Sequence, residues 1–398
     1  MISWRAIFSA PKRSLRRDDR ALGRGDNFSD AGGTKLDQNG VIVWQRSFAG
    51  VYSVATDASG AIFVVGASEG PTDFGGGAVS ATGYFVAKYS ANGVYQWVLG
   101  PFPTVIWTHV VVRANGNVVA VGALEAPQNL GSATISPNGA ADALFLELTS
   151  SGTYVSAKAW GDSGRQEIDS ITIDGSGNFV MVGYAEGSID FGGGAMTGPL
   201  NAGSHNAFIV KLDGTGAFVK QRGTGSTGQD HFRAVTIDSS GRVLVVGSLS
   251  TTMTFGGATK TPVSPADIVI AALDTNLTEV WSRQYGSTGT QLALGMAADP
   301  GGGFAIAGFA NGDLSFGLGG LPPNVQFPYV ARFDANGNPV SNFAPTGNVG
   351  TIGLDVAYLT SGDYVFAGRC VPVQVGFPWG SMYCPENSGN AFVTRMRP

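Results

Sequence analysis

Apolar and polar residues along the chain follow a pattern that recurs about every sixty residues. Each copy has an apolar strand, a short polar turn and a second apolar strand that ends in glycine, as in ITIDGSGNFVMVG and VTIDSSGRVLVVG. Self-similarity at a fixed period is the signature of a repeat architecture. The six terminal glycines stand 56 to 64 residues apart and are Gly66, Gly122, Gly183, Gly247, Gly308 and Gly368.

A second pair of strands follows in each copy, for example FIVKLDGTGAFVK and YFVAKYSANGVYQW. Alternating apolar and polar positions indicate strands whose two faces pack differently. We name the strands of a copy A, B, C and D, with short A–B and C–D turns and longer B–C and D–A loops. Four antiparallel strands repeated in this way predict an all-β fold, a six-bladed β-propeller with four-stranded blades.

The B–C loops share an apolar residue that follows the terminal glycine by eight positions, or by nine in the last copy. We expect this side chain to anchor the loop, and the DFGGG glycines there to allow a left-handed backbone. The residues are Phe74, Leu130, Phe191, Phe255, Phe316 and Phe377.

The two ends of the chain predict how the ring closes. The C-terminus stops after one more C-type strand (391–397), and an unpaired D-type strand lies at 41–48. We expect the N-terminal D-type strand to pair with three C-terminal strands, because closure removes exposed strand edges. Residues 34–40, TKLDQNG, also resemble the end of another C strand with its turn, as expected if the sequence begins inside a repeat. The predicted single propeller domain spans 34–398.

Composition agrees with strands and tight turns. Glycine supplies 60 of the 398 residues and charged residues only 13%. No apolar run approaches the roughly 18 residues of a membrane helix, so no membrane span is expected. The first 24 residues carry seven basic and two acidic side chains, and the remainder carries 17 basic and 27 acidic ones. The acidic body argues against nucleic acid as a partner. Residues 1–33 are expected to be a disordered basic leader or the product of a misassigned start.

Both cysteines, Cys370 and Cys384, fall in the last B–C loop. Such an isolated pair is typical of a local disulfide in an exported protein, with two unrelated thiols as the alternative. No histidine lies nearby to complete a zinc site, and we expect no metal and no cofactor.

These repeats resemble those of the bacterial, myxobacterial-type SBBP β-propeller repeat proteins, whose repeat is similar to IDxSGNxYVxG, a DFGGG loop and FVAKxDxxG. Here SIDFGGG, FIVKLDGTG, TDFGGG and YFVAKYSANG carry the likeness, which covers residues 34–398. The resemblance implies the propeller fold and a secreted or cell-surface location, and it implies no catalytic residues. The family is named for seven blades, which makes seven the less favoured alternative to the six counted here. No signal peptide is visible, because the N-terminus lacks an apolar core of the usual length.

Several repeated side chains have structural interpretations. Turn aspartates such as Asp57 and Asp174 are expected to cap their own turns rather than hold calcium. The D-strand tryptophans Trp44, Trp97 and Trp281 are expected to pack between blades, with sugar stacking as the alternative. A C-strand position is expected to face solvent, and it carries Lys88, Glu147, Lys211, Ala272 and Arg332.

Function is predicted from the places where the repeat breaks, because structural positions must recur. The D–A loops and the last B–C loop differ most, and both open on one face of a propeller. The chain has three histidines and neither a GxSxG nor an HExxH motif, so an enzyme is not expected. The favoured hypothesis is a non-catalytic, monomeric binding or scaffold propeller with a protein partner. The alternatives are a lectin for surface glycans, and a hydrolase or lyase with a site at the channel mouth. Candidate ligand-binding residues are Trp107, Arg165, Glu167, Asp230, His231, Trp379 and Tyr383.

Overall fold

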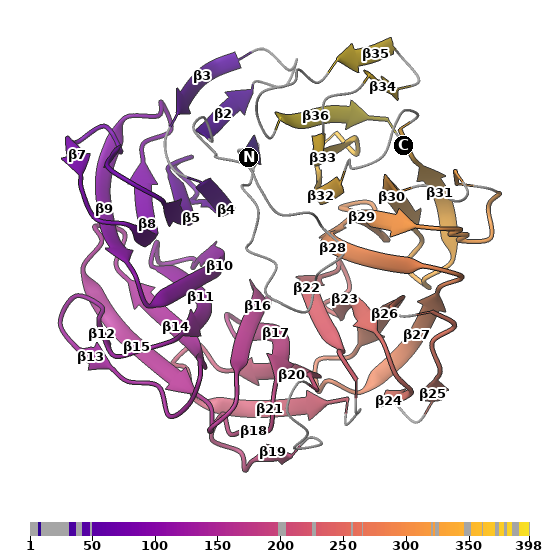
Figure 1. Cartoon of the computed structure of the whole chain (residues 1–398), viewed down its shortest axis with the longest axis horizontal. Coiled ribbons are helices and arrows are strands. Elements are labelled where there is room, and N and C mark those ends of the chain that lie inside the picture. Colours follow the sequence, from indigo (N-terminus) through magenta and orange to yellow (C-terminus); the bar gives the residue numbers. More distant parts are fainter. Residues whose placement is uncertain are drawn as a thin grey trace.

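The computed structural model shows a ring of antiparallel sheets and, in the part of the chain that it describes, no helix (Figure 1). The described residues are 7–8, 32–36, 42–47, 50–197, 204–224, 228–255, 258–264, 266–319, 321–322, 326–345, 352–359, 361–370, 374–377, 380–383 and 390–397.

The six sequence repeats form six blades, which confirms the predicted six-bladed β-propeller. Blade 1 consists of β4 (Gly50–Thr56), β5 (Ile62–Ser68), β8 (Gly83–Tyr89) and β9 (Tyr95–Phe102). Blade 2 consists of β10 (Val105–Val112), β11 (Val118–Leu124), β14 (Asp142–Leu148) and β15 (Tyr154–Trp160). Blade 3 consists of β16 (Gln166–Ile173), β17 (Phe179–Ala185), β20 (Asn206–Leu212) and β21 (Phe218–Gly223).

The remaining blades follow the same order. Blade 4 consists of β22 (His231–Ile237), β23 (Val243–Leu249), β26 (Asp267–Leu273) and β27 (Glu279–Tyr285). Blade 5 consists of β28 (Thr290–Ala298), β29 (Phe304–Asn311), β30 (Gln326–Phe333) and β31 (Pro339–Phe343). Within the described residues, blade 6 consists of β32 (Ile352–Tyr358), β33 (Tyr364–Cys370) and β36 (Asn390–Met396).

The closure differs from the predicted one. The strand at 41–48, here β3 (Ile42–Ser47), pairs with β2 (Gly32–Leu36) in the register Lys35↔Trp44, and not with β36. With β1 (Ile7–Phe8) these strands form a further three-stranded sheet, the N-terminal sheet, between β36 and blade 1 (Figure 1). The prediction was wrong because only five residues separate β2 from β3 in the sequence, and pairing neighbouring segments costs less chain entropy than pairing the two chain ends.

A bulge in the innermost strand explains the repeated glycines. In each blade the A–B register shifts by one residue directly opposite the glycine, as between Trp107 and His109 opposite Gly122. A Cβ added to Gly122 would lie 1.8 Å from the carbonyl oxygen of Ile106, and one on Gly183 would lie 2.0 Å from that of Glu167. Only glycine allows the two backbones to approach so closely.

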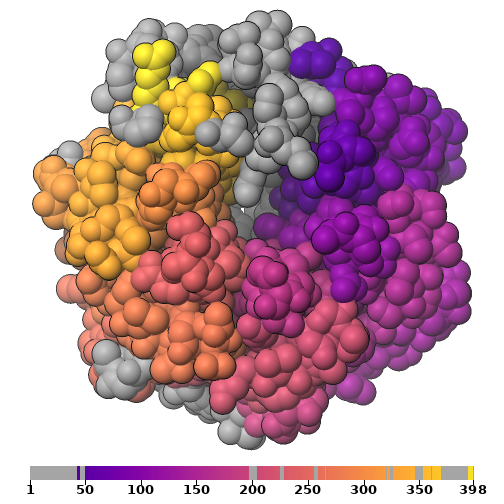
Figure 2. All heavy atoms as spheres, turned by 180° about the vertical axis from the view of Figure 1, so that it is seen from behind, coloured from indigo at the N-terminus to yellow at the C-terminus, as the bar shows by residue number. Residues whose placement is uncertain are grey.

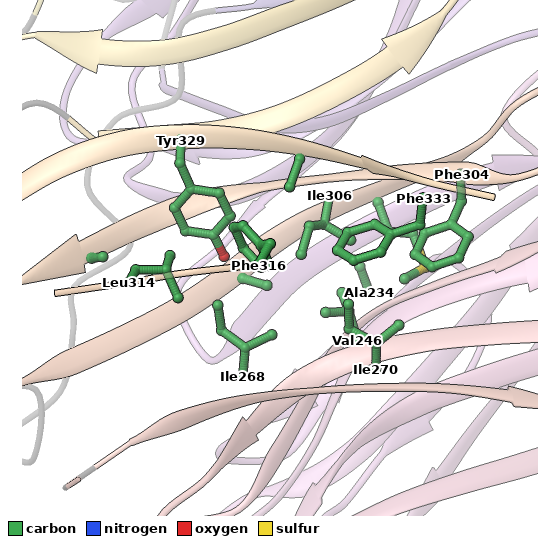
Figure 3. Close-up of a cluster of buried hydrophobic side chains, with 14 of the residues drawn as sticks. Ala234, Val246, Ile268, Ile270, Phe304, Ile306, Leu314, Phe316, Tyr329 and Phe333 are labelled. Atoms are coloured by element: carbon green, nitrogen blue, oxygen red, sulfur yellow. The ribbon is translucent and has the colours of Figure 1, made fainter. Parts of the chain in front are cut away.

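The hydrophobic cores lie between neighbouring blades. One core joins residues of blade 4, such as Val246 and Ile270, to residues of blade 5, such as Phe304, Phe316 and Tyr329 (Figure 3). Strands B and C are buried on both faces, whereas strand D forms the half-exposed outer edge. Because each blade covers the next, the apolar residues of the described B and C strands are buried between blades.

The B–C loops contain small two-stranded hairpins anchored by the predicted apolar residues. Phe74, Leu130, Phe191 and Phe316 are at most 3% exposed. The side chains of Phe255 and Phe377 lie outside the described part of the structure. The hairpins are β6 (Thr72–Asp73) with β7 (Ala78–Val79), β12 (Gln128–Asn129) with β13 (Thr134–Ile135), β18 (Ser188–Ile189) with β19 (Met196–Thr197), β24 (Met253–Phe255) with β25 (Ala258–Lys260), and β34 (Gln374–Phe377) with β35 (Gly380–Tyr383).

The turn aspartates cap their turns as expected. Oδ1 of Asp57 accepts hydrogen bonds from the amides of Ser59 and Ala61, both at 2.9 Å. In the DFG segment, Oδ1 of Asp73 likewise accepts from the amides of Gly75 and Gly77. These aspartates therefore stabilise turns by an Asx-type hydrogen bond.

Outer-strand tryptophans pack against the following blade. A Cβ on Gly152, in the C–D turn of blade 2, would lie 2.9 Å from the Trp97 ring of blade 1. A Cβ on Gly337 would likewise lie 2.7 Å from the Trp281 ring. The Trp97 indole also donates to the carbonyl of Ser150 at 3.2 Å. Trp97 and Trp281 therefore pack between blades, as expected from the sequence.

The C-strand charges do not all face solvent, which corrects the sequence expectation. Glu147 is 7% and Lys211 6% exposed, because neighbouring blades cover the C strands on both faces. Each is therefore paired: Lys211 with Asp174 at 2.8 Å, and Glu147 with Arg113 at 2.7 Å. Burial of a charge on a strand requires such a partner.

The space-filling view from behind shows the blades around a central hollow (Figure 2). Among the described residues, none belongs to a helix long and apolar enough to cross a membrane.

Candidate functional site

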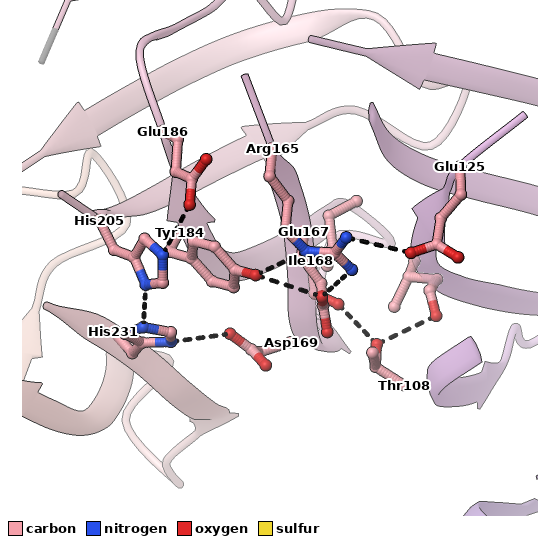
Figure 4. A network of polar contacts seen from close by, with 11 residues as sticks. Thr108, Glu125, Arg165, Glu167, Ile168, Asp169, Tyr184, Glu186, His205 and His231 are labelled. Carbon is pink, nitrogen blue, oxygen red and sulfur yellow. Dashed lines mark hydrogen bonds and ion pairs between the residues drawn. The ribbon is translucent and has the colours of Figure 1, made fainter. Parts of the chain in front are cut away.

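Polar side chains that break the repeat gather where blades 2, 3 and 4 meet. They come from the starts of β16 and β22, from the end of β17, and from the residues that follow β11 and precede β20 (Figure 4). All of these backbone positions open on the face that carries the B–C and D–A loops, which we call the loop face. We call this group the junction cluster; it comprises Glu125, Arg165, Glu167, Asp169, Tyr184, Glu186, His205 and His231.

Arg165 is the centre of the first half of the junction cluster. Its guanidinium contacts Glu125 of blade 2 and Glu167 of its own blade, each at 3.1 Å, and donates to the Tyr184 hydroxyl at 3.0 Å. Burial lowers the pKa of Arg165, but Tyr184 and Glu167 outweigh that effect and raise it. Burial and the nearby Glu167 carboxylate raise the pKa of Tyr184, so its hydroxyl stays protonated at physiological pH. Arg165 therefore joins blades 2 and 3 through buried, charge-assisted hydrogen bonds.

Two histidines form the second half of the junction cluster. Nδ1 of His205 lies 2.5 Å from Nε2 of His231, and Nε2 of His205 lies 3.0 Å from a carboxylate oxygen of Glu186. On the far side, Nδ1 of His231 lies 4.0 Å from Asp169. The Tyr184 ring stacks on His205, with ring centroids 4.2 Å apart, and contacts His231 at 4.3 Å. A continuous polar chain thus links blades 3 and 4.

The structure brings together three of the candidate residues: Arg165, Glu167 and His231. It places Asp230, the sequence neighbour of His231, in a fully buried position, with Oδ1 accepting from the Ser250 amide at 2.8 Å. That bond ties the start of β22 to the B–C loop of the same blade.

Trp107 lies elsewhere. Its side chain is 1% exposed, in the core between blades 1 and 2 with Val105, Val110 and Leu130. It occupies the core position that Ile168 and Phe232 take in blades 3 and 4, opposite the repeated glycine. The buried indole is thus not accessible to a ligand on the loop face, because it fills a structural position of the repeat.

The last B–C loop falls largely outside the described residues, including Trp379 and Cys384. Tyr383 ends β35 and Cys370 ends β33, but their side chains are also outside the description. The predicted disulfide and the predicted aromatic platform therefore stay predictions.

Several junction residues were missed from the sequence. Glu125 and Glu186 each follow the repeated glycine by three positions, as does the exposed Glu69 of blade 1. Aligning that position would have shown an acidic residue in three successive blades. His205 lies at the end of the B–C loop of blade 3, which the sequence does not single out, and Asp169 lies at the bulge of β16, which a period-two pattern does not reveal.

The junction cluster contains charged side chains that can bind a charged partner, and histidines and carboxylates that can transfer protons. Its more accessible members are Glu125 and Glu186, whose side chains are 31% and 27% exposed. Within the described residues no group of three histidine, cysteine or acidic side chains is arranged to hold a metal ion. The two histidines in particular direct a nitrogen at each other and not at a common point.

Comparison with known proteins finds solved structures of low similarity and no matching family. No family model and no curated protein matches the chain. Among solved structures, a protein from Lactobacillus plantarum is similar over 99% of this chain and 100% of its own, at 10% identity and a TM-score of 0.46. The WD40 domain of Pan2 from Neurospora crassa covers 87% of this chain and 79% of its own, at 12% identity and a TM-score of 0.42. A glucose dehydrogenase covers 87% and 96%, at 10% identity and a TM-score of 0.41.

At such low identity these structures say nothing about ligand or reaction. The propeller fold of this chain rests on its own strand pairing.

Proposed function

We propose that the protein is a non-catalytic binding or scaffold propeller that engages a protein partner through its loop face. The observation that carries the proposal is the junction cluster, where side chains that break the repeat meet the recurring acidic residues Glu125 and Glu186 on one face of three adjacent blades. In a propeller the repeated positions build the ring, so side chains that depart from the repeat are free to serve recognition.

The charges indicate the chemistry of the partner. Glu69, Glu125 and Glu186 occupy the same repeat position on blades 1, 2 and 3, and each is exposed or half-buried. A partner segment bearing lysine or arginine fits this face, because complementary charge speeds and orients association. Following the SBBP resemblance, we further propose that the protein is exported or displayed at the cell surface as a monomeric ring.

A pull-down from native cell envelope tests the proposal. Glu69→Lys reverses the charge at an exposed residue outside the bonded cluster, and we expect it to reduce recovery of a basic partner about tenfold. Lys220→Ala on the outer strand β21 is the matched control and should leave recovery unchanged. The pair Trp379→Ala and Tyr383→Ala tests the last loop of the same face. Equal recovery of every partner by all variants would contradict the proposal.

The second candidate is a hydrolase or lyase with a site at the channel mouth. The favouring observation is the convergence of Glu186, His205 and His231, since carboxylates and imidazoles at hydrogen-bonding distance can act in general acid–base catalysis. Turnover of a glycosidic, ester or uronide substrate by the wild type, abolished in His231→Leu, would favour this candidate.

A further inference from the structure

His205 and His231 meet at the seam between blades 3 and 4. The main chain joins the blades there: the amide of His205 donates to the carbonyl of Gly228 at 2.7 Å, and the amide of Asp230 donates to that of His205 at 3.0 Å. The two side chains add a contact between ring nitrogens at 2.5 Å, with ring centroids 4.6 Å apart.

The same main-chain bridge recurs at two other seams, where the position of His205 is occupied by alanine. Ala141 bridges to Arg165 between blades 2 and 3, and Ala266 bridges to Thr290 between blades 4 and 5. The position of His231 is occupied by Leu292 in blade 5. The imidazole pair is therefore an addition to a seam that forms without it elsewhere in the ring.

The contact between ring nitrogens limits how many protons the pair can hold. One nitrogen must donate and the other accept, so the four ring nitrogens carry at most three protons while the contact lasts. Glu186 favours a proton on Nε2 of His205, and Asp169 favours one on Nδ1 of His231. With the shared proton between the rings, the closed pair carries a single positive charge. A fourth proton would place two N–H groups and two cations against each other.

Tyr184 and Arg165, on one side of the histidine pair, keep their charge states near neutral pH. Tyr184 stacks on His205, contacts the His231 ring and stays neutral, since burial raises its pKa. Arg165 and Glu167 lie at the far end of Tyr184, bound to its hydroxyl and to each other, and Glu125 lies beyond Arg165.

On β22 itself, Arg233 lies two residues from His231, and Asp230 is bound to the amide of Ser250. Segments 201–203 and 225–227, next to this seam in the sequence, contain no ionisable side chain. Histidine is the side chain whose ordinary titration falls between about pH 5 and 8.

We propose that the His205–His231 pair is a proton-sensitive lock on the seam between blades 3 and 4, closed with one shared proton and released when both rings are protonated. Release would separate the starts of β20 and β22 and rearrange the junction cluster on the loop face. The lock follows from geometry alone and does not depend on the proposed partner.

Hydrogen exchange of the full chain, read by mass spectrometry at pH 7.5 and pH 5.0 and corrected for intrinsic exchange, tests the lock. In the wild type we expect peptides covering 228–235 to lose about tenfold protection at pH 5.0. Peptides covering 288–296, at the seam without histidines, should keep theirs. His205→Ala carries the residue found at the other two seams and should abolish the pH dependence at 228–235, whereas His109→Ala should retain it.

Should His205→Ala fail to fold, His231→Leu removes the same pair with the residue of blade 5. Equal protection of 228–235 at both pH values in the wild type would overturn the lock. So would an undiminished loss of protection in the variant that lacks the pair.

Discussion

At the scale of single residues, the repeated glycine is the strictest requirement of this ring. Glycine is not needed here to adopt a left-handed backbone, since Gly122, Gly183 and Gly247 have no positive φ. Each faces the carbonyl that the bulge pushes toward it, at a distance no side chain fits. The same bulge directs Asp169 and Thr108 to the neighbouring seams, where Thr108 donates to the carbonyl of Ile168 in the next blade. The bulge in strand A and the glycine in strand B therefore depend on each other, because the bulged carbonyl leaves no room for a side chain.

Gly183→Ala should lower the free energy of unfolding by about 3 kcal/mol, because the new methyl group would overlap the carbonyl of Glu167. The matched control in the same blade is Gly175→Ala, where a Cβ would meet nothing within 4 Å. That control should change the free energy by less than about 1 kcal/mol. Urea titration of both variants measures the difference, and equal midpoints would refute this account of the glycine.

Acid should destabilise the ring through its turn aspartates. Burial raises the pKa of Asp174, but hydrogen bonds from Lys211, Asn178 and Ser176 outweigh it and hold the pKa below its ordinary value. Asp238 is lowered in the same way by Ser240 and Arg242. The unfolded chain then binds more protons in acid, so this stabilisation is present above about pH 4 and is lost as the pH falls through the folded values.

Urea unfolding of the wild type and of Lys211→Met, each at pH 6 and at pH 3, measures this loss of stability in acid. The variant should be less stable at pH 6 and lose less on acidification. An identical pH dependence in wild type and variant would be inconsistent with the role given to Lys211.

At the scale of elements, a cation joins each of the first four blades to the C–D turn of the next. Lys88, Arg113, Lys211 and Arg242 come from different strands or turns, yet each donates to a carbonyl in the following turn. In blade 3 the cation lies on strand C and its carboxylate partner in the A–B turn, and in blade 2 the two are exchanged. Arg113 stands at the A–B turn position that other blades fill with aspartate. Glu147 on strand C supplies the carboxylate that this turn lacks, so the ion pair is kept.

Because the cation and the carboxylate have exchanged positions between blades 2 and 3, a second substitution should restore the stability that the first one removes. Glu147→Lys alone places two cations together in a buried site and should cost about 3 kcal/mol of folding free energy. Adding Arg113→Asp recreates the arrangement of Asp174 and Lys211 and should recover most of that loss. A double-mutant cycle by urea unfolding measures the coupling, and additive effects of the two substitutions would disprove it.

At the scale of the whole molecule, the N-terminal sheet completes the packing around blade 1. Trp44 of β3 packs with Val51 and Ile62, and its ring lies 2.8 Å from where a Cβ on Gly93 would stand. Trp97 makes the equivalent contact with Gly152 between blades 1 and 2. The N-terminal sheet therefore meets blade 1 as one blade meets the next.

Trp44→Ala should accordingly destabilise the ring about as much as Trp97→Ala, each by about 3 kcal/mol, because both remove a large side chain from an equivalent seam. Thermal unfolding of the two variants side by side checks this. A normal melting temperature for Trp44→Ala together with a lowered one for Trp97→Ala would show that the N-terminal sheet does not support the ring.

The sequence by itself determined the six repeats, their four-strand plan, the anchored B–C loops and the capped turns. These features are local, and each leaves a periodic mark such as the glycine of strand B or the aspartate of the A–B turn. Only the tertiary structure decided which repeat positions contact one another between neighbouring strands and blades. It paired Arg113 with Glu147, placed Trp107 in a core and brought His205 of blade 3 against His231 of blade 4. It also paired β3 with β2 instead of the C-terminal strand. One chain reports periodicity along its length, whereas ring closure and the contacts between blades join residues far apart in sequence.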